Sequence, residues 1–175
     1  MGFDPAQHHR RSVRLATFDY IDGAFFVTIC TTNRECTLGE IVDGLVRLKP
    51  VGEIVAEEWI RSSTLRAEVN LDEWVVMPNH LHGILHLEPV PNTAAVHSPL
   101  PRRPGSLGSV VGGFKSAVTT RVNTIQDTPG RPVWQRGYHE HVIRTERELR
   151  AIREYIADNP RRWGEDEDNP VNWKR

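Results

Sequence analysis

Apolar residues recur along the first half of the chain with two different periods, and these periods predict its elements. The segment 24–32 is β-branched and aromatic, which is typical of a central β-strand. Through 49–63, apolar residues recur at helical spacing with acidic residues between them, which predicts an amphipathic helix. Two short apolar runs, 71–77 and 80–88, are separated only by a Pro-Asn turn. They predict an antiparallel hairpin.

The second half repeats this alternation after a loop. Residues 89–106 contain five prolines and no periodicity, which predicts an exposed loop. Apolar residues at 3/4 spacing then predict a second helix over 107–125, and 133–144 has the pattern of a fourth strand. Thr145 and Glu148 have capping-box spacing, so a third helix is expected over 146–159, ending before Pro160.

This order of elements predicts the fold class. Strand-helix-strand followed by strand-helix-strand is typical of an α+β, ferredoxin-like antiparallel sheet with both helices on one face. A further C-terminal helix follows. At 175 residues the chain is expected to form a single domain, 1–175, with a leader (1–19) and a tail (161–175) at its periphery.

Composition excludes several classes of protein. With 38% hydrophobic and 26% charged residues the chain can bury a core, and the composition is unlike that of disordered proteins. No apolar run is long enough for a membrane span, and the first residues lack the apolar core of a signal peptide. A cytoplasmic protein without membrane contact is therefore expected. Cys30 and Cys36 are interpreted as reduced packing residues.

The net charge of −1 argues against nucleic-acid binding by charge alone. It hides an asymmetry, because 35–73 carries an excess of five acids and 99–150 an excess of five bases. This polarity is consistent with one anion-binding face, and equally with a solvated mixed surface.

The hairpin carries the first candidate for chemistry. His80 and His82 flank one leucine on a strand, so both imidazoles point to the same face and can converge on one divalent ion. The alternative is two histidines that form hydrogen bonds at a sheet surface. His86 lies too far along the strand to share the ion. The triplet 139–141 (His-Glu-His) is a competing site that spacing alone does not exclude.

The third helix carries the second candidate. Tyr155 and Asn159 are four residues apart and so occupy one helix face, at the edge of the apolar stripe. Tyr155 is either an amphipathic residue with its ring on the core or a phenolic nucleophile beside a metal-ligating amide. A free phenol has a pKa of about 10, so a nucleophilic role requires a cation or base nearby.

Several separated motifs together resemble one family. They are Tyr20 and Gly23 with FFVTICTTNR, WVVMPNHLHG, GSLGSVVGGFKS, VWQRGYHEHVIR and YIADNP, in the order in which that family has them. The chain resembles the REP-associated tyrosine transposases, a branch of the single-tyrosine HUH (IS200-like) transposases, over most of its length.

The resemblance implies a fold, an activity and a site. The fold is ferredoxin-like, with the catalytic tyrosine on the C-terminal helix. His80 and His82 are implied metal ligands with Asn159 as the third, Tyr155 is the implied nucleophile, and Mg²⁺ or Mn²⁺ suits the donor set. The implied activity is that of a metal-dependent single-stranded DNA endonuclease and strand transferase, acting on hairpin or palindromic repeat DNA through a 5′-phosphotyrosine intermediate. The 139–141 cluster then has a supporting or structural role.

Basic residues near these motifs are candidate DNA contacts. They are Arg10, Arg11, Arg14, Arg102, Arg103, Lys115, Arg136, Arg144, Arg161 and Arg162. The sequence leaves two other functions open, a domesticated hairpin-DNA-binding protein without turnover and a hydrolase that uses a metal-bound water. It also leaves open whether the protein is a monomer or a homodimer, and whether the acidic tail covers the site.

Overall fold

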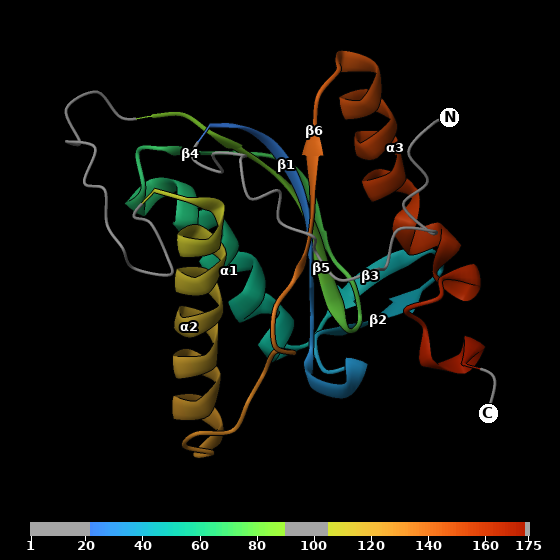
Figure 1. The fold of residues 1–175 in the computed structure, drawn as a ribbon. Coiled ribbons are helices and arrows are strands. Elements are labelled where there is room, and N and C mark those ends of the chain that lie inside the picture. Colours follow the sequence, from blue (N-terminus) through green and yellow to red (C-terminus); the bar gives the residue numbers. More distant parts are fainter. Residues whose placement is uncertain (1–21, 90–104, 174–175) are drawn as a thin grey trace.

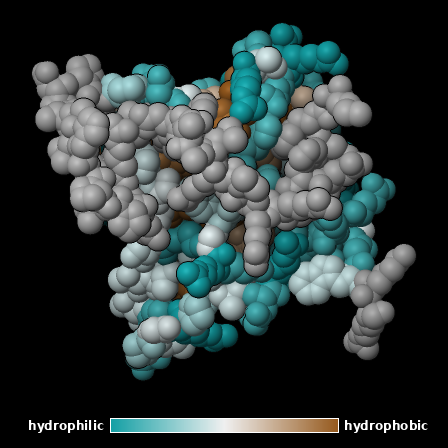
Figure 2. Space-filling view, in the orientation of Figure 1, coloured by the Kyte–Doolittle hydropathy of each residue, from teal (hydrophilic) through white to brown (hydrophobic). Residues whose placement is uncertain are grey.

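A computed structural model describes residues 22–89 and 105–173. The leader expected over 1–19 and most of the loop expected over 89–106 lie outside these residues. None of the helices in the described part of the chain is long and apolar enough to cross a membrane. In the view of Figure 2 the described residues present a mainly hydrophilic surface, with apolar groups visible only in narrow gaps.

Four strands form the central sheet: β1 (Gly23–Cys30), β4 (Val69–Val76), β5 (His80–Leu87) and β6 (His139–Ile143). Their order is β4-β5-β1-β6, and every neighbouring pair is antiparallel. The two strands of the hairpin lie at one side of β1, and the last strand lies at the other (Figure 1). The predicted ferredoxin-like sheet is confirmed.

The helices divide between the two faces of this sheet. Helices α1 (Pro50–Leu65) and α2 (Leu107–Gln126) cover one face, and α3 (Glu146–Arg162) lies over the other (Figure 1). The main apolar core lies under α1 and α2. At its centre the Trp59 ring is fully buried and packs directly on Gly83 of β5, where a Cβ atom would lie only 2.5 Å from the ring.

A second, two-stranded sheet was not anticipated. It consists of β2 (Gly39–Val42) and β3 (Leu45–Leu48). The turn between them, Asp43-Gly44, has positive φ at both residues, 53° and 75°. An Asp-Gly pair between two β-prone runs is a strong hairpin signal, so the sequence did contain the information.

The fourth strand is shorter than predicted. Trp134 makes only an isolated bridge to Thr31, and β6 begins at His139. Gly137, with φ of 81°, interrupts the extended backbone. The Lys115 ammonium group donates to the carbonyl oxygens of Gln135 and Gly137 at 2.7 Å each, which ties this segment to α2.

The expected end of the third helix was wrong. Helix α3 continues through Pro160 to Arg162 and leads into a short 3₁₀ turn, Trp163–Glu165. Proline in a helix interior removes one backbone hydrogen bond and disfavours helical geometry in the preceding residue. Burial of Ile156 and Asn159 on either side of the missing bond opposes that cost and keeps Asn159 within the helix.

Candidate active site

The two candidate ligand histidines lie side by side under α3. Successive side chains of β5 point to opposite faces of the sheet, so His80 and His82 face α3 while Leu81 and Leu85 enter the main core. His80 is fully buried, His82 is 3% exposed, and the centroids of their rings are 4.3 Å apart. The alternation predicted for the hairpin therefore brings the two imidazoles together.

Each imidazole is held by a hydrogen bond at its Nδ1 atom. The His80 Nδ1 lies 2.8 Å from Oδ1 of Asn79, and the His82 Nδ1 lies 2.9 Å from Oγ1 of Thr28 on β1. An imidazole that donates through Nδ1 keeps its Nε2 lone pair for a metal ion, and such partners fix the orientation of ligand histidines. Asn79 is itself fixed, because its Nδ2 donates to the carbonyl oxygens of Arg34 and Asp168.

Tyr155 places its hydroxyl group at this pair. Its oxygen lies 3.3 Å from Nε2 of His82, and its ring meets the edge of Phe26. Burial raises the pKa of the Tyr155 phenol, and the negative charge of Asp166 raises it further, while a hydrogen bond with Asn159 lowers it. The phenol is thus protonated at neutral pH, and any attack by its oxygen requires a positive charge at the site.

Asn159 completes the group from one helical turn beyond Tyr155. Its side chain is 3% exposed, and among the described residues no hydrogen-bond partner reaches its buried Oδ1 atom. A buried carbonyl oxygen without a partner is costly, and a cation would satisfy it. Two imidazoles and one amide oxygen form a donor set that fits Mg²⁺ or Mn²⁺.

A metal site built only from ionisable ligands is not present in the part of the chain that the structure describes. No three His, Cys, Asp or Glu side chains of residues 22–89 and 105–173 converge to hold an ion. The competing 139–141 triplet is engaged elsewhere, because His141 Nε2 lies 2.6 Å from a carboxylate oxygen of Glu148. His86 likewise lies against Asp72, at 2.9 Å.

The C-terminal segment closes over the histidines. Asp168 is buried and forms an ion pair with Arg34, and one of its carboxylate oxygens lies 3.9 Å from His80 Nδ1. The Trp163 ring lies 6.0 Å from the His80 ring, measured between centroids. Residues of the acidic tail therefore lie against His80 at the candidate site.

The candidate DNA contacts separate into three groups. Arg10, Arg11, Arg14, Arg102 and Arg103 lie outside the described residues. Lys115 is bound to backbone carbonyl groups, as described above. Arg136, Arg144, Arg161 and Arg162 are exposed, and Arg161 also lies 3.8 Å from Asp158. Arg161 and Arg162 follow Asn159 after Pro160, which makes them the candidate contacts nearest in sequence to the site.

Sequence reasoning missed the residues that support the ligands. Asn79 lies within the turn of the hairpin, and the Pro-Asn pair predicted only that turn. Thr28 lies opposite His82 in the β1–β5 register, so its role appears only once the strand pairing is known. Asp168 comes from the tail, far along the chain from His80.

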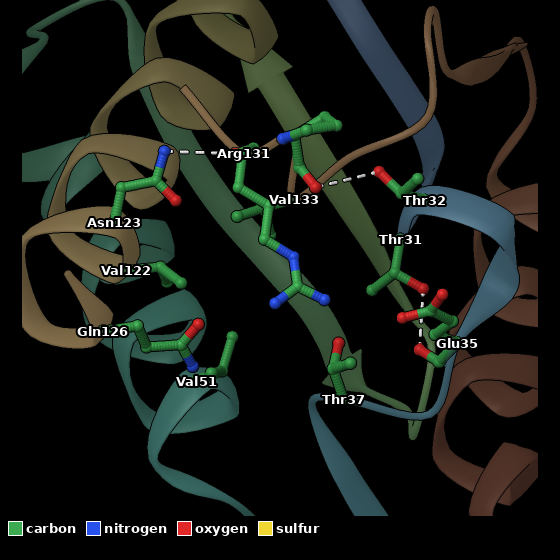
Figure 3. A pocket seen from close by; sticks show the side chains of 11 residues that line it. Thr31, Thr32, Glu35, Thr37, Val51, Val122, Asn123, Gln126, Arg131 and Val133 are labelled. Carbon is green, nitrogen blue, oxygen red and sulfur yellow. Dashed lines mark hydrogen bonds between the residues drawn. The ribbon is translucent and has the colours of Figure 1, made fainter. Parts of the chain in front are cut away.

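A separate cavity lies at the α1 and α2 side of the molecule (Figure 3). It has a volume of about 150 Å³ and lies between the end of α2, the start of α1 and the segments 31–37 and 131–133. The Arg131 side chain points into it, toward Thr37 (Figure 3). None of the candidate ligands lines it, and neither does Tyr155.

Comparison of the sequence with known proteins identifies a relative of this chain. A protein of Haemophilus influenzae, described as uncharacterized, is 37% identical over 169 residues, which cover 91% of this chain and 93% of that protein. The chain belongs to the same family as this protein. No family model matches the chain.

A solved structure shows the same fold. It is that of a REP-associated tyrosine transposase bound to a REP hairpin, with a TM-score of 0.60 and 22% sequence identity, over 89% of this chain and 73% of that one. The fold expected from the sequence resemblance is therefore confirmed.

Proposed function

We propose that the chain is a metal-dependent single-stranded DNA endonuclease and strand transferase of the transposase type, with Tyr155 as its nucleophile. One observation carries this proposal. The Tyr155 hydroxyl lies 3.3 Å from a ring nitrogen of His82, beside His80 and the unpartnered amide oxygen of Asn159. A nucleophile and a hard-cation donor set thus share one buried site, within a fold that also occurs in a hairpin-bound transposase.

In the proposed reaction each residue has one role. His80, His82 and Asn159 would hold Mg²⁺ or Mn²⁺, which would polarise the scissile phosphate and stabilise the charge that develops there. The Tyr155 oxygen would attack phosphorus as the bond to the 3′-oxygen breaks; the phenol gives its proton to solvent, and the departing 3′-oxygen takes up a proton from solvent. The products are a 5′-phosphotyrosine and a free 3′-hydroxyl group. Because the covalent bond retains the phosphodiester energy, a second 3′-hydroxyl group can reverse the step and join strands.

The substrate follows from the position of the nucleophile. Tyr155 lies on a half-buried helix face, where it cannot reach the backbone of an intact duplex in line. We therefore propose single-stranded DNA at the foot or loop of a hairpin as the substrate.

Replacement of Tyr155 by Phe tests the proposal. With a labelled hairpin that carries single-stranded flanks, and with Mn²⁺, the parent protein should form a covalent adduct that survives denaturation. Y155F should form none, because the attacking oxygen is absent. Y138F, at a half-buried tyrosine that packs against the main core, is the matched control and should retain the adduct.

Three outcomes would contradict the proposal. Cleavage by Y155F at the rate of the parent would exclude the tyrosine mechanism. Hairpin binding by the parent without any adduct, in either Mg²⁺ or Mn²⁺, would favour a binding protein without turnover. Hydrolysis without an adduct that is lost in H80A would favour a hydrolase that uses a metal-bound water.

A further inference from the structure

A small apolar cluster holds the tyrosine helix on the sheet. Ile152 and Ile156 are the buried apolar residues of α3, and they pack with Phe26 and Ile84, while the partly buried Leu149 and Tyr155 pack against the same cluster. Apolar burial is non-directional, so this contact keeps α3 on the sheet without fixing its rotation about its own axis. The position of the Tyr155 hydroxyl depends on that rotation.

A directional contact lies on one flank of the helix. The Arg153 guanidinium group donates to both carboxylate oxygens of Asp72 on β4, at 3.0 and 3.2 Å from Nε and 2.6 Å from the terminal nitrogen. His86 of β5 contacts the same carboxylate at 2.9 Å. The pKa of Asp72 is lowered to about 2, chiefly by the hydrogen bond from Arg153. Planar, bidentate pairs of this kind fix geometry as well as charge.

A β-bulge in β4 begins at Asp72. The β4–β5 register shifts between Leu71 and Trp74, so β4 carries one extra residue at this point. Leu71 faces the main core, so the alternation of the strand turns Asp72 toward α3. The bulge accommodates the extra residue before Trp74, which also packs against the main core.

A second directional contact lies on the opposite flank. Glu148 of α3 lies 2.6 Å from Nε2 of His141 on β6, and it also accepts the backbone N–H of Arg144 at 2.8 Å. Strands β4 and β6 are the two edges of the central sheet. Helix α3 is thus attached to both edges by carboxylate contacts, and these contacts use His86 and His141, two histidines that are not candidate metal ligands.

We propose that the Asp72–Arg153 pair and the Glu148–His141 pair are positioning contacts that set the rotation of α3 and hence the place of the Tyr155 oxygen at His82. This inference rests on the proposed function, in which that oxygen is the nucleophile. Arg153 and Tyr155 are two residues apart and so lie on opposite flanks of the helix. A phenolic oxygen on the order of 6 Å from the helix axis moves by roughly 1 Å for a rotation of about 10°, and an error of 1 Å in a reacting group can cost about 100-fold in rate.

The molecule contains a matched control on its other face. Arg121 of α2 donates to Glu57 and Glu58 of α1, at 2.6 and 2.8 Å, so it is also an arginine that joins two elements through carboxylates. It lies against α1, away from Tyr155. A merely structural ion pair should behave as Arg121 does, and a positioning pair should not.

The experiment compares R153M, D72N and R121M with the parent. Adduct formation is measured in a single turnover at saturating Mn²⁺ and hairpin DNA, together with the dissociation constants for Mn²⁺ and for DNA. We expect the adduct rate to fall at least 10-fold in R153M and D72N, with both constants within about twofold of the parent. R121M should react at the parental rate. R153K retains the charge without the planar fork and should give an intermediate rate.

A second measurement requires no activity. Incorporation of 3-fluorotyrosine gives a ¹⁹F resonance for Tyr155, which is assigned by its absence in Y155F. We expect R153M and D72N to shift or broaden this resonance and R121M to leave it unchanged. Parental rates and an unchanged resonance in R153M would overturn the inference, and so would equal loss of rate in R121M. An active Y155F would instead overturn the proposed function, whatever the resonance shows.

Discussion

The two faces of the central sheet differ in what fills them. On the face that α1 and α2 cover, Trp59, Phe114 and Leu85 belong to one large apolar core. On the face that α3 covers, the apolar cluster is small and lies beside His82 and Asn159. The face under α1 and α2 buries a large group of apolar side chains. The face under α3 buries a smaller apolar group together with polar side chains that lie against one another.

Strand β5 supplies both faces. Its odd-numbered residues Leu81 and Leu85 enter the large core, and its even-numbered residues His80 and His82 form the candidate site. The rigid packing of one set fixes the backbone that carries the other. The positions of His80 and His82 therefore depend on the large core on the opposite face of β5. The following substitutions test this dependence.

The largest effect is expected at the centre of the large core. Trp59→Ala removes a fully buried ring that packs on Gly83, so we expect it to lower the free energy of unfolding by about 3–5 kcal/mol. Denaturant-induced unfolding measures this change. Trp173→Ala, at a ring that is 46% exposed, is the control and should change the free energy by less than about 0.5 kcal/mol. Equal effects at the two tryptophans would refute the assignment of this face to stability.

A smaller effect of opposite sign is expected on the other face. Asn159→Leu replaces a buried amide whose oxygen lacks a partner among the described residues, so it should raise the free energy of unfolding by about 1 kcal/mol. The same change should abolish Mn²⁺ binding, which calorimetry measures. The control is Asn123→Leu, because the Asn123 amide group donates to the carbonyl of Arg131, and this change should destabilise the protein. A less stable N159L that still binds Mn²⁺ would exclude Asn159 as a metal ligand.

The smallest effect is expected in acid. The pKa of Asp72 is about 2 in the folded protein, below its ordinary value near 3.8, so the ionised carboxylate stabilises the fold. That contribution is fully present above about pH 4 and is lost as the pH falls through about 2. The difference in unfolding free energy between the parent and Asp72→Asn should therefore shrink between pH 5 and pH 2. A difference that stays constant over this range would mean that the Asp72–Arg153 pair does not stabilise the fold.

Periodicity predicted most of the fold because each main element buries one clear face. The alternation in β5 and the 3/4 spacing in α2 directly indicated which residues are buried. The end of α3 could not be predicted, because the burial of Asn159 in the folded chain gives no local signal and outweighs the local effect of Pro160. The β2–β3 hairpin has a local signal, the Asp43-Gly44 turn, so it could have been predicted from the sequence.

For the candidate site, the sequence indicated the reactive groups and not their supports. His80 and His82 follow from strand alternation, and Tyr155 and Asn159 follow from helix spacing and from the family resemblance. Thr28 contacts His82 through the register of two strands, and residues separated by 54 positions carry no local signal of such a contact. Asp72 was counted only as part of an acidic surface, since its partner Arg153 lies 81 positions along the chain and gives no local signal.

The bulge in β4 shifts the alternation of side chains between the two faces by one residue, so the strand has a different frame on each side of the bulge. Before the bulge, odd-numbered residues such as Val69 and Leu71 face the large core, and after it, even-numbered residues such as Trp74 and Val76 do. Deletion of a single residue at 72–73 would restore one frame along the whole strand. Val69, Leu71, Trp74 and Val76 would then all face the large core in that single frame, so the large core does not require the extra residue.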